Sequence, residues 1–270
     1  MAAEVAGRRQ RRRLPAWSWL WLGLAAIYLL VPLYSTLQFS LQVGHDRYGL
    51  SWYADVLRDP SFRHSFLLSL RLALETVIIG LALMVPTVYW VHLHLPGMRP
   101  VLEFISVLPF VVPPIALAVG ILGLFQDTPW IISSTQLLAF VYVIQALPFT
   151  YRSLDAGMLA VDIRTLTHAS YSVGASWWQT LWHVILPNLR AAMLASAFLT
   201  IAIVLGEYTI SSLLLFNTFA VYIQYIGTTQ AYEAAALAIL SFALTWAAML
   251  GLFLLTRLRT GPRPAGGMTR

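Results

Sequence analysis

Long apolar stretches, each separated from the next by a shorter polar segment, constrain this sequence more than any other feature. Each holds about 20 residues or more, enough to cross the roughly 30 Å hydrocarbon core of a bilayer as an α-helix. Their ranges are 17–37, 66–90, 101–125, 131–151, 191–216 and 232–255. Only 10% of the residues are charged, whereas soluble proteins carry about 25%. The sequence therefore predicts an all-α, polytopic membrane protein with six transmembrane helices within residues 17–257.

The distribution of positive charge predicts how these helices are oriented. All 17 basic residues are arginines. One set of alternate segments, together with both ends, contains Arg8, Arg9, Arg11, Arg12, Arg13, Arg99, Arg152, Arg164, Arg190, Arg257, Arg259, Arg263 and Arg270. The other segments contain only Arg47, Arg58 and Arg63, and Arg71 lies within the second stretch. Because arginine-rich segments stay on the cytoplasmic side, we expect residues 1–16 and 258–270 to be cytoplasmic in a bacterial inner membrane.

The sequence has no lysine and no cysteine, and both absences limit its chemistry. The phosphate-binding loop of an ATPase needs the lysine of G-x-x-x-x-G-K-[ST], so ATP and Mg²⁺ must be held by a partner. Without cysteine there is no disulfide and no thiolate metal site. His92 and His94 are two residues apart and point to different sides of a helix, which makes a poor metal pair. We therefore expect a non-enzymatic chain without a cofactor or metal of its own.

The segment 154–189 is neither apolar enough to cross a bilayer nor loose enough to be a linker. Two short amphipathic helices are predicted here, joined at Gly174, where a chain leaves a helix in a left-handed turn. The first apolar stripe comprises Leu166, Ala169, Ser170 and Val173. The second comprises Trp178, Leu181, Trp182 and Ile185, and we expect Pro187 to end that helix. Such a segment between transmembrane helices is suited to docking onto a partner.

This segment, LTHASYSVGASWWQTLWHVILPNL, resembles the "EAA…G…LP" cytoplasmic loop of the permease subunits of ATP-binding-cassette importers. The matching positions are Leu166, Ala169, Gly174, Ala175, Ser176, Leu186 and Pro187. The sequence departs from the pattern at His168, where the family has glutamate, and at Ser170, where it has alanine. The resemblance implies that the loop, including Thr167, fits a cleft on an ATPase subunit and couples ATP hydrolysis to alternating access.

The same resemblance implies the partners of the chain. Two permease subunits would form the pathway, two ATPase subunits would bind below them, and a soluble extracytoplasmic binding protein would deliver the substrate. Whether the second permease is a copy of this chain or a paralogue stays open. The rival interpretations are a six-span carrier or channel that works without partners, and a structural membrane subunit.

Charged residues within the apolar stretches are candidates for the translocation pathway, because such charges usually face protein or water. Arg71 and Glu75 are one helical turn apart, and Glu207 and Tyr208 lie in the fifth stretch. At 1.5 Å per residue, Glu75 and Glu207 lie at about the same depth. They either line a pathway for a cation or are paired off, Glu75 with Arg71 and Glu207 with hydroxyl groups.

The substrate is expected to be a small polar or charged solute. YADVLRDPSFRHSF resembles the spermidine/putrescine-type subfamily, which favours a polyamine. Importers of iron(III), thiamine, sulfate or molybdate, and phosphonate are the alternatives within the family.

Overall fold

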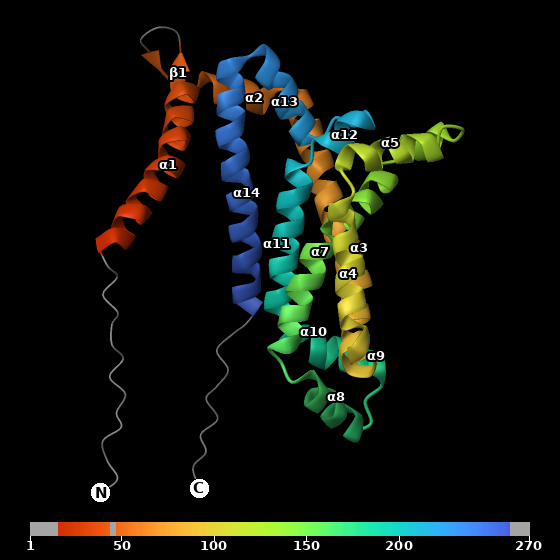
Figure 1. The fold of residues 1–270 in the computed structure, drawn as a ribbon. Helices are drawn as coiled ribbons and strands as arrows, with labels where there is room; N and C mark the ends of the chain where they lie inside the picture. The colour runs from red at the N-terminus through yellow and green to blue at the C-terminus, as the bar shows by residue number, and fades with distance from the viewer. Residues whose placement is uncertain (1–15, 44–46, 260–270) are drawn as a thin grey trace, which may run out of the picture.

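The computed structural model describes residues 16–43 and 47–259, so most of the basic N-terminal segment and the C-terminal tail lie outside the described residues. The described chain is almost entirely helical (Figure 1). The helices are α1 (Ala16–Leu41), α2 (Ser51–Arg58), α3 (Pro60–His94), η1 (Pro96–Met98), α4 (Arg99–Val111), α5 (Pro114–Leu124), α6 (Pro129–Ile132), α7 (Thr135–Leu159), α8 (Ile163–Ser172), α9 (Trp177–Thr180), η2 (Leu181–Ile185), α10 (Leu186–Asn188), α11 (Arg190–Gly206), α12 (Thr209–Leu213), α13 (Phe219–Thr229) and α14 (Ala231–Arg259). The two-residue strands β1 (Gln42–Val43) and β2 (Arg47–Tyr48) pair antiparallel.

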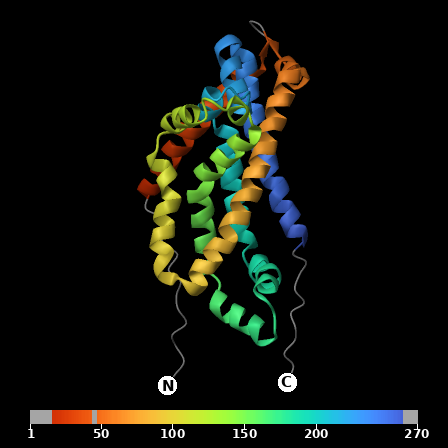
Figure 2. The ribbon, with the colours of Figure 1, turned by 90° about the vertical axis from the view of Figure 1, so that its right-hand side faces the viewer.

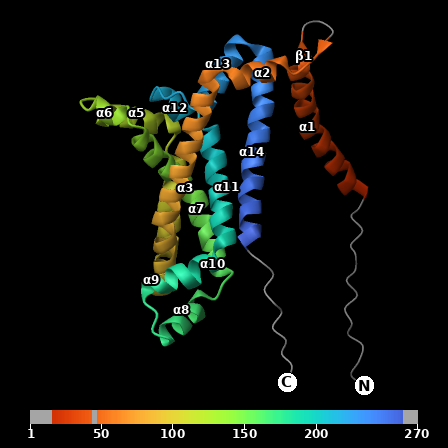
Figure 3. The same cartoon turned by 180° about the vertical axis from the view of Figure 1, so that it is seen from behind.

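The long helices stand side by side, with α8 at one end of the bundle and α2 and α13 at the other (Figures 1 and 3). Among the described residues, three helices are long and apolar enough to cross a membrane: α1, α3 and α7. Two bent pairs, one comprising α4 and α5 and the other ending in α11, raise the number to five if each is one span. The sixth predicted span corresponds to α14, of which Ala231–Ala247 is a shorter apolar helix. The predicted all-α, polytopic fold is confirmed.

The third predicted span is not one continuous helix, which corrects the expectation for residues 101–125. The chain bends by 87° between Pro96–Val111 and Pro114–Leu124. Val112 is extended, with φ −87° and ψ 118°, because a residue that precedes proline is disfavoured in the helical region. Pro113 and Pro114 also lack the N–H groups that would continue the ladder. As a result α5 extends sideways from the bundle beside α12 (Figure 1), on the side that faces the viewer in Figure 2.

The fifth predicted span is also interrupted. Helix α11 ends at Gly206, Glu207 is extended with ψ 114°, and the short helix α12 restarts at Thr209. At the other end of this span, Pro187 does not end the preceding helix as predicted. It lies inside α10, and the chain bends by 74° between Trp177–Asn188 and Arg190–Gly206. A single π-turn, η2, precedes the proline.

The core lies between α3, α7 and α11, and most of the largest fully buried side chains belong to α3 and α7. Leu72, Leu138 and Tyr142 are completely buried in the half that includes α12. Tyr89, Leu154 and Ile185 are buried in the other half, next to α8. Helix α1 leaves the bundle beyond its contact with α14 (Figure 1). None of the residues in its most apolar stretch is buried. Apolar side chains that face outward along a spanning helix are suited to lipid.

Candidate functional site

The connection between α7 and α11 folds into a compact basal segment, defined here as residues 160–189. Helix α8 begins after Asp162, whose side chain accepts a hydrogen bond from the Thr165 backbone N–H. Helix α9 begins after Ser176, which forms a capping box with Gln179. Between them Gly174 has φ +83°, a conformation that glycine adopts without steric cost. The two helices joined at a left-handed Gly174 are therefore confirmed.

Asp162 makes the start of α8 sensitive to low pH. Hydrogen bonds from the Thr165 side chain, at 2.7 Å, and from its backbone hold the pKa of Asp162 below the ordinary 3.8. A lowered pKa in the folded state means that the cap stabilises α8 above about pH 4 and is lost as the pH falls through the folded-state pKa. We expect the protection of α8 amide hydrogens, measured relative to their intrinsic exchange rate at each pH, to fall on acidification below that range. Asp162→Asn, which caps without titrating, should remove this pH dependence, and an unchanged dependence would contradict the assignment.

The buried faces of the basal segment differ from the predicted stripes. In α8 the residues that face the bundle are Ile163, Thr167 and Ser170, so only Ser170 of the predicted stripe is buried. In the second stripe Leu181 and Ile185 are buried as predicted. Trp178 and Trp182 are each 61% exposed, which corrects their assignment to the packed face. The π-turn changes the angular spacing after Thr180, so a regular 3.6-residue period does not predict the position of Trp182.

Hydroxyl groups fasten the basal segment to the bundle. The Tyr89 hydroxyl on α3 lies 2.9 Å from Thr167 Oγ1 on α8. Ser170 Oγ lies 2.9 Å from Thr180 Oγ1, which joins α8 to α9. Tyr89, Thr167 and Thr180 are fully buried, and buried polar pairs of this kind hold their partners in one register. His168, Ala169, Val173, Gly174 and Ser176 are exposed on the outer side of the segment, and Ala175 and Leu186 are half-buried.

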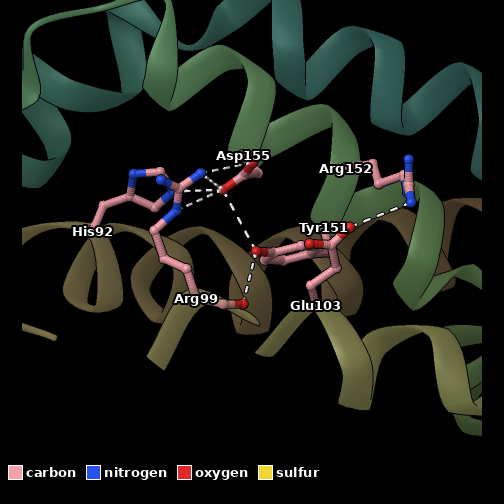
Figure 4. Close-up of polar contacts among 6 residues, drawn as sticks. All are labelled: His92, Arg99, Glu103, Tyr151, Arg152 and Asp155. Carbon is pink, nitrogen blue, oxygen red and sulfur yellow. Dashed lines mark hydrogen bonds and ion pairs between the residues drawn. The ribbon is translucent and has the colours of Figure 1, made fainter. Parts of the chain in front are cut away.

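Asp155 joins three helices immediately above the basal segment (Figure 4). Its Oδ1 lies 2.7 Å from His92 Nε2 at the end of α3. Arg99, at the start of α4, donates through Nη2 to both carboxylate oxygens, at 3.0 and 3.2 Å. The Tyr151 hydroxyl donates to the Arg99 backbone carbonyl at 3.2 Å. Helices α3, α4 and α7 are thus held together through one carboxylate.

Sequence reasoning does not identify this network. The sequence identifies His92 only as part of a poor metal pair and Arg99 only as one of the arginines that set the orientation, so neither points to the other. The available signal is Asp155, an acid near the end of an apolar helix, one turn after Tyr151. Such a carboxylate needs a cation, because a charge at this depth is costly without a partner. The sequence contains many arginines and does not say which one supplies the partner.

The residues proposed for the pathway make contacts within the chain. Arg71 Nε lies 2.7 Å from Glu75 Oε1. Glu207 accepts hydrogen bonds from the backbone N–H groups of Ile210 and Ser211 and from the hydroxyl groups of Ser211 and Tyr142. Both acids therefore have the partners that the paired-off alternative names. Tyr208 is 43% exposed.

Glu207 and Tyr208 line a cavity of about 350 Å³ together with Gln145. Pro109, Phe110 and Phe149 supply much of its apolar wall. Arg71 and Glu75 are not among its lining residues, so the structure does not bring the four candidates together at this cavity. Within the described ranges, no group of three histidine or acidic residues is placed to hold a metal ion.

The fold and the sequence together define the class of protein. Residues 97–260, more than half of the chain, match the family described as "binding-protein-dependent transport system inner membrane component". The chain belongs to this family and is a membrane-embedded permease subunit of an ATP-binding-cassette importer. The resemblance stated for the loop after α7 is thereby confirmed at the level of the family.

Individual relatives agree with this assignment. The chain is 25% identical over 206 residues to a probable sulfate transport system permease protein of Chlorokybus atmophyticus, covering 72% of this chain and 70% of that protein. It is 27% identical over 226 residues to sulfate permease 2, chloroplastic, of Chlamydomonas reinhardtii, covering 78% of this chain and 58% of the relative. A putative ferric transport system permease protein of Haemophilus influenzae is 31% identical over 118 residues, which are 43% of this chain and 18% of that protein.

A solved structure shares the fold. The crystal structure of a bacterial ABC transporter involved in the import of the acidic polysaccharide alginate superimposes with a TM-score of 0.66. The match covers 91% of this chain and 98% of that chain at 14% sequence identity. At this identity the likeness concerns the arrangement of helices and not the transported molecule.

Proposed function

We propose that the basal segment is the surface through which an ATPase partner drives this permease. The observation that carries the proposal is the contrast between its two faces. The inner face is fixed to α3 by Tyr89 and Thr167, whereas the outer face leaves Val173 84% exposed. An ATPase can therefore bind the exposed outer face, and a movement of the segment would shift α3 through the contacts of the inner face.

In this proposal the chain pairs with a second permease subunit, two ATPases hold ATP and Mg²⁺, and a soluble protein delivers the substrate outside. ATP binding would favour one of two conformations, and movement of α8 would carry this preference to α3 through Tyr89. The hydrogen bonds of Asp155 on α7 would carry the same conformational preference to α4. The mechanism is a population shift between inward-facing and outward-facing states.

A charge placed on the exposed face tests this docking surface. In Val173→Asp we expect a tagged chain, purified in mild detergent, to lose most of its co-purifying ATPase and ATP hydrolysis, because a carboxylate in a docked interface must be desolvated. The matched control is Leu57→Asp on α2, at the opposite end of the molecule, where Leu57 is 45% exposed. Equal ATPase recovery from both variants would contradict the proposal, and a chain that transports without any ATPase would favour the carrier or channel.

For the substrate, we propose an oxyanion of the sulfate class. The relatives of Chlorokybus and Chlamydomonas carry sulfate in their names, and sulfate is among the alternatives that the sequence leaves open. The resemblance of YADVLRDPSFRHSF to the spermidine/putrescine-type subfamily favours a polyamine, and acids available to bind a cation would support that preference. Glu75 is already paired with Arg71, and Glu207 is already bonded by four donors. That support for a polyamine is therefore removed, and the relatives reported above do not supply another.

Uptake by intact cells tests the substrate. We expect deletion of the gene to reduce uptake of radiolabelled sulfate and to leave uptake of radiolabelled spermidine unchanged. Restoring the wild-type chain should restore sulfate uptake, whereas the Val173→Asp chain should not. A loss of spermidine or iron(III) uptake with normal sulfate uptake would overturn the proposed substrate and leave the proposed docking surface untouched.

A further inference from the structure

A nearly apolar groove lies where the basal segment turns into α11. Its walls are Leu81 from α3 and Met193, Leu194 and Ala197 from α11. Trp182, Leu186 and Pro187 close it at the base, and its volume is about 400 Å³. Figure 3 shows α3, α10 and α11, the elements that form it, meeting at this end of the bundle. A groove with this lining suits a hydrocarbon chain and not a polar solute.

Of the residues that the structure describes, Arg190 is the one charged residue that lines this groove. Its side chain is exposed and makes no ion pair with any residue in the described part of the chain. It is also the first residue of α11, where a cation adds to the positive end of the helix dipole. An anion beside Arg190 would therefore be stabilised by both the guanidinium group and the helix.

We propose that this groove binds an anionic phospholipid of the cytoplasmic leaflet. One acyl chain would lie along α11 beside Met193, Leu194 and Ala197, and the phosphate would contact Arg190. Arg190 and Ala197 are separated by about 10 Å along the helix axis, roughly a third of the thickness of the hydrocarbon core. The groove is therefore long enough for the part of one acyl chain that is nearest to the head group.

The partly exposed tryptophan at the base of the groove is consistent with a position at the level of the lipid head groups. Trp182 is 61% exposed, and tryptophan favours the level of the lipid head groups. A zwitterionic phospholipid would gain the same apolar contacts without the net attraction to Arg190. The groove therefore distinguishes an anionic lipid from a neutral one by the charge at its rim.

A lipid in this groove would contact both arms of the 74° bend between Trp177–Asn188 and Arg190–Gly206. Pro187 and Trp182 belong to the first arm and Leu194 to the second. Its binding would favour one angle of the bend, which adds a lipid-dependent control to the conformational change. The proposal depends on the membrane environment and not on which solute is transported.

Native mass spectrometry of the purified complex tests the proposal. Samples are titrated separately with phosphatidylglycerol and phosphatidylcholine. We expect Arg190→Gln to weaken retention of phosphatidylglycerol about fivefold, the effect of one arginine near an anionic surface, and to leave phosphatidylcholine unchanged. Arg152→Gln is the matched control, because Arg152 is exposed on the same side but pairs with Glu103 and does not line the groove. Equal weakening by both variants, or by neither, would overturn the proposal.

A second variant asks what occupies the groove in the membrane. The chain has no cysteine, so Leu194→Cys introduces a single thiol into the wall. We expect it to react with a thiol-specific probe carried on the acyl chain of a phospholipid in native membranes. A disulfide between two copies of this variant would show that a protein chain covers the groove, and it would overturn the lipid proposal.

Discussion

Gly174→Val should reduce transport about tenfold while leaving the chain in the membrane. Gly174 has φ +83°, and a residue with a Cβ atom in the left-handed region costs roughly 1–2 kcal/mol, which corresponds to about a 5–30-fold change in an equilibrium. A Cβ atom at this position would meet nothing within 4 Å. The effect would therefore arise from the backbone of the turn and would change the angle between α8 and α9. Uptake in cells measures transport. ATP hydrolysis by the purified complex measures the ATPase activity to which transport is coupled.

Two controls separate this effect from general damage. Gly174→Asn should retain most of the transport, because asparagine tolerates the left-handed region better than other residues with a side chain. Gly23→Val on α1 makes the same change where a Cβ atom also meets nothing within 4 Å and no positive φ is required. We expect near-normal transport from that variant. Normal transport by Gly174→Val or Gly174→Asp would count heavily against a coupling role for the turn.

Asp155→Asn should destabilise the permease by about 2 kcal/mol. Removing one member of a fully buried ion pair costs about 3–5 kcal/mol, and the value is reduced here because Asp155 and Arg99 keep 19% and 33% of their side-chain surface exposed. Arg99 and His92 would both lose a charged acceptor. For a chain of this length we expect the thermal midpoint in detergent to fall by about 4–8 °C.

Glu103→Gln is the control for the loss of a carboxylate. Glu103 pairs with Arg152 at 3.3 Å, but their side chains are 50% and 71% exposed. Exposed pairs of this kind contribute about 0–1 kcal/mol. Its thermal midpoint should stay within about 2 °C of the wild type. Equal midpoints for Asp155→Asn and Glu103→Gln would show that the contacts of Asp155 do not hold the three helices together.

Several features of the fold are set by local chemistry and follow from the sequence. The apolar stretches predict the long helices because backbone groups in lipid must be bonded internally. Gly174 predicts the turn between α8 and α9 because the required φ is costly for other residues. The "GEYTISSLLLF" segment gives no comparable local signal for a break at Glu207, because no proline interrupts the helix there.

The continuity of the spans is where the sequence predictions fail. Pro113 and Pro114 are visible in the sequence, and prolines within apolar runs are compatible with either a tolerated kink or a full break. The 87° bend also depends on the packing of α5 against α12, which comes much later in the chain. Similarly, α11 ends at Gly206. The next residue, Glu207, accepts hydrogen bonds from the backbone of α12 and from the Tyr142 hydroxyl on α7. One of these partners lies 65 residues away in the chain.

The sequence by itself determined the class of fold, the lack of an ATP-binding loop and the position of the turn at Gly174. These depend on hydropathy, residue type and backbone preference, which act locally. Only the tertiary structure decided which side chains of the basal segment face the bundle, which arginine pairs with Asp155, and where the groove at Arg190 forms. Those features join residues from different helices, and their energies depend on distances that no single stretch of sequence contains.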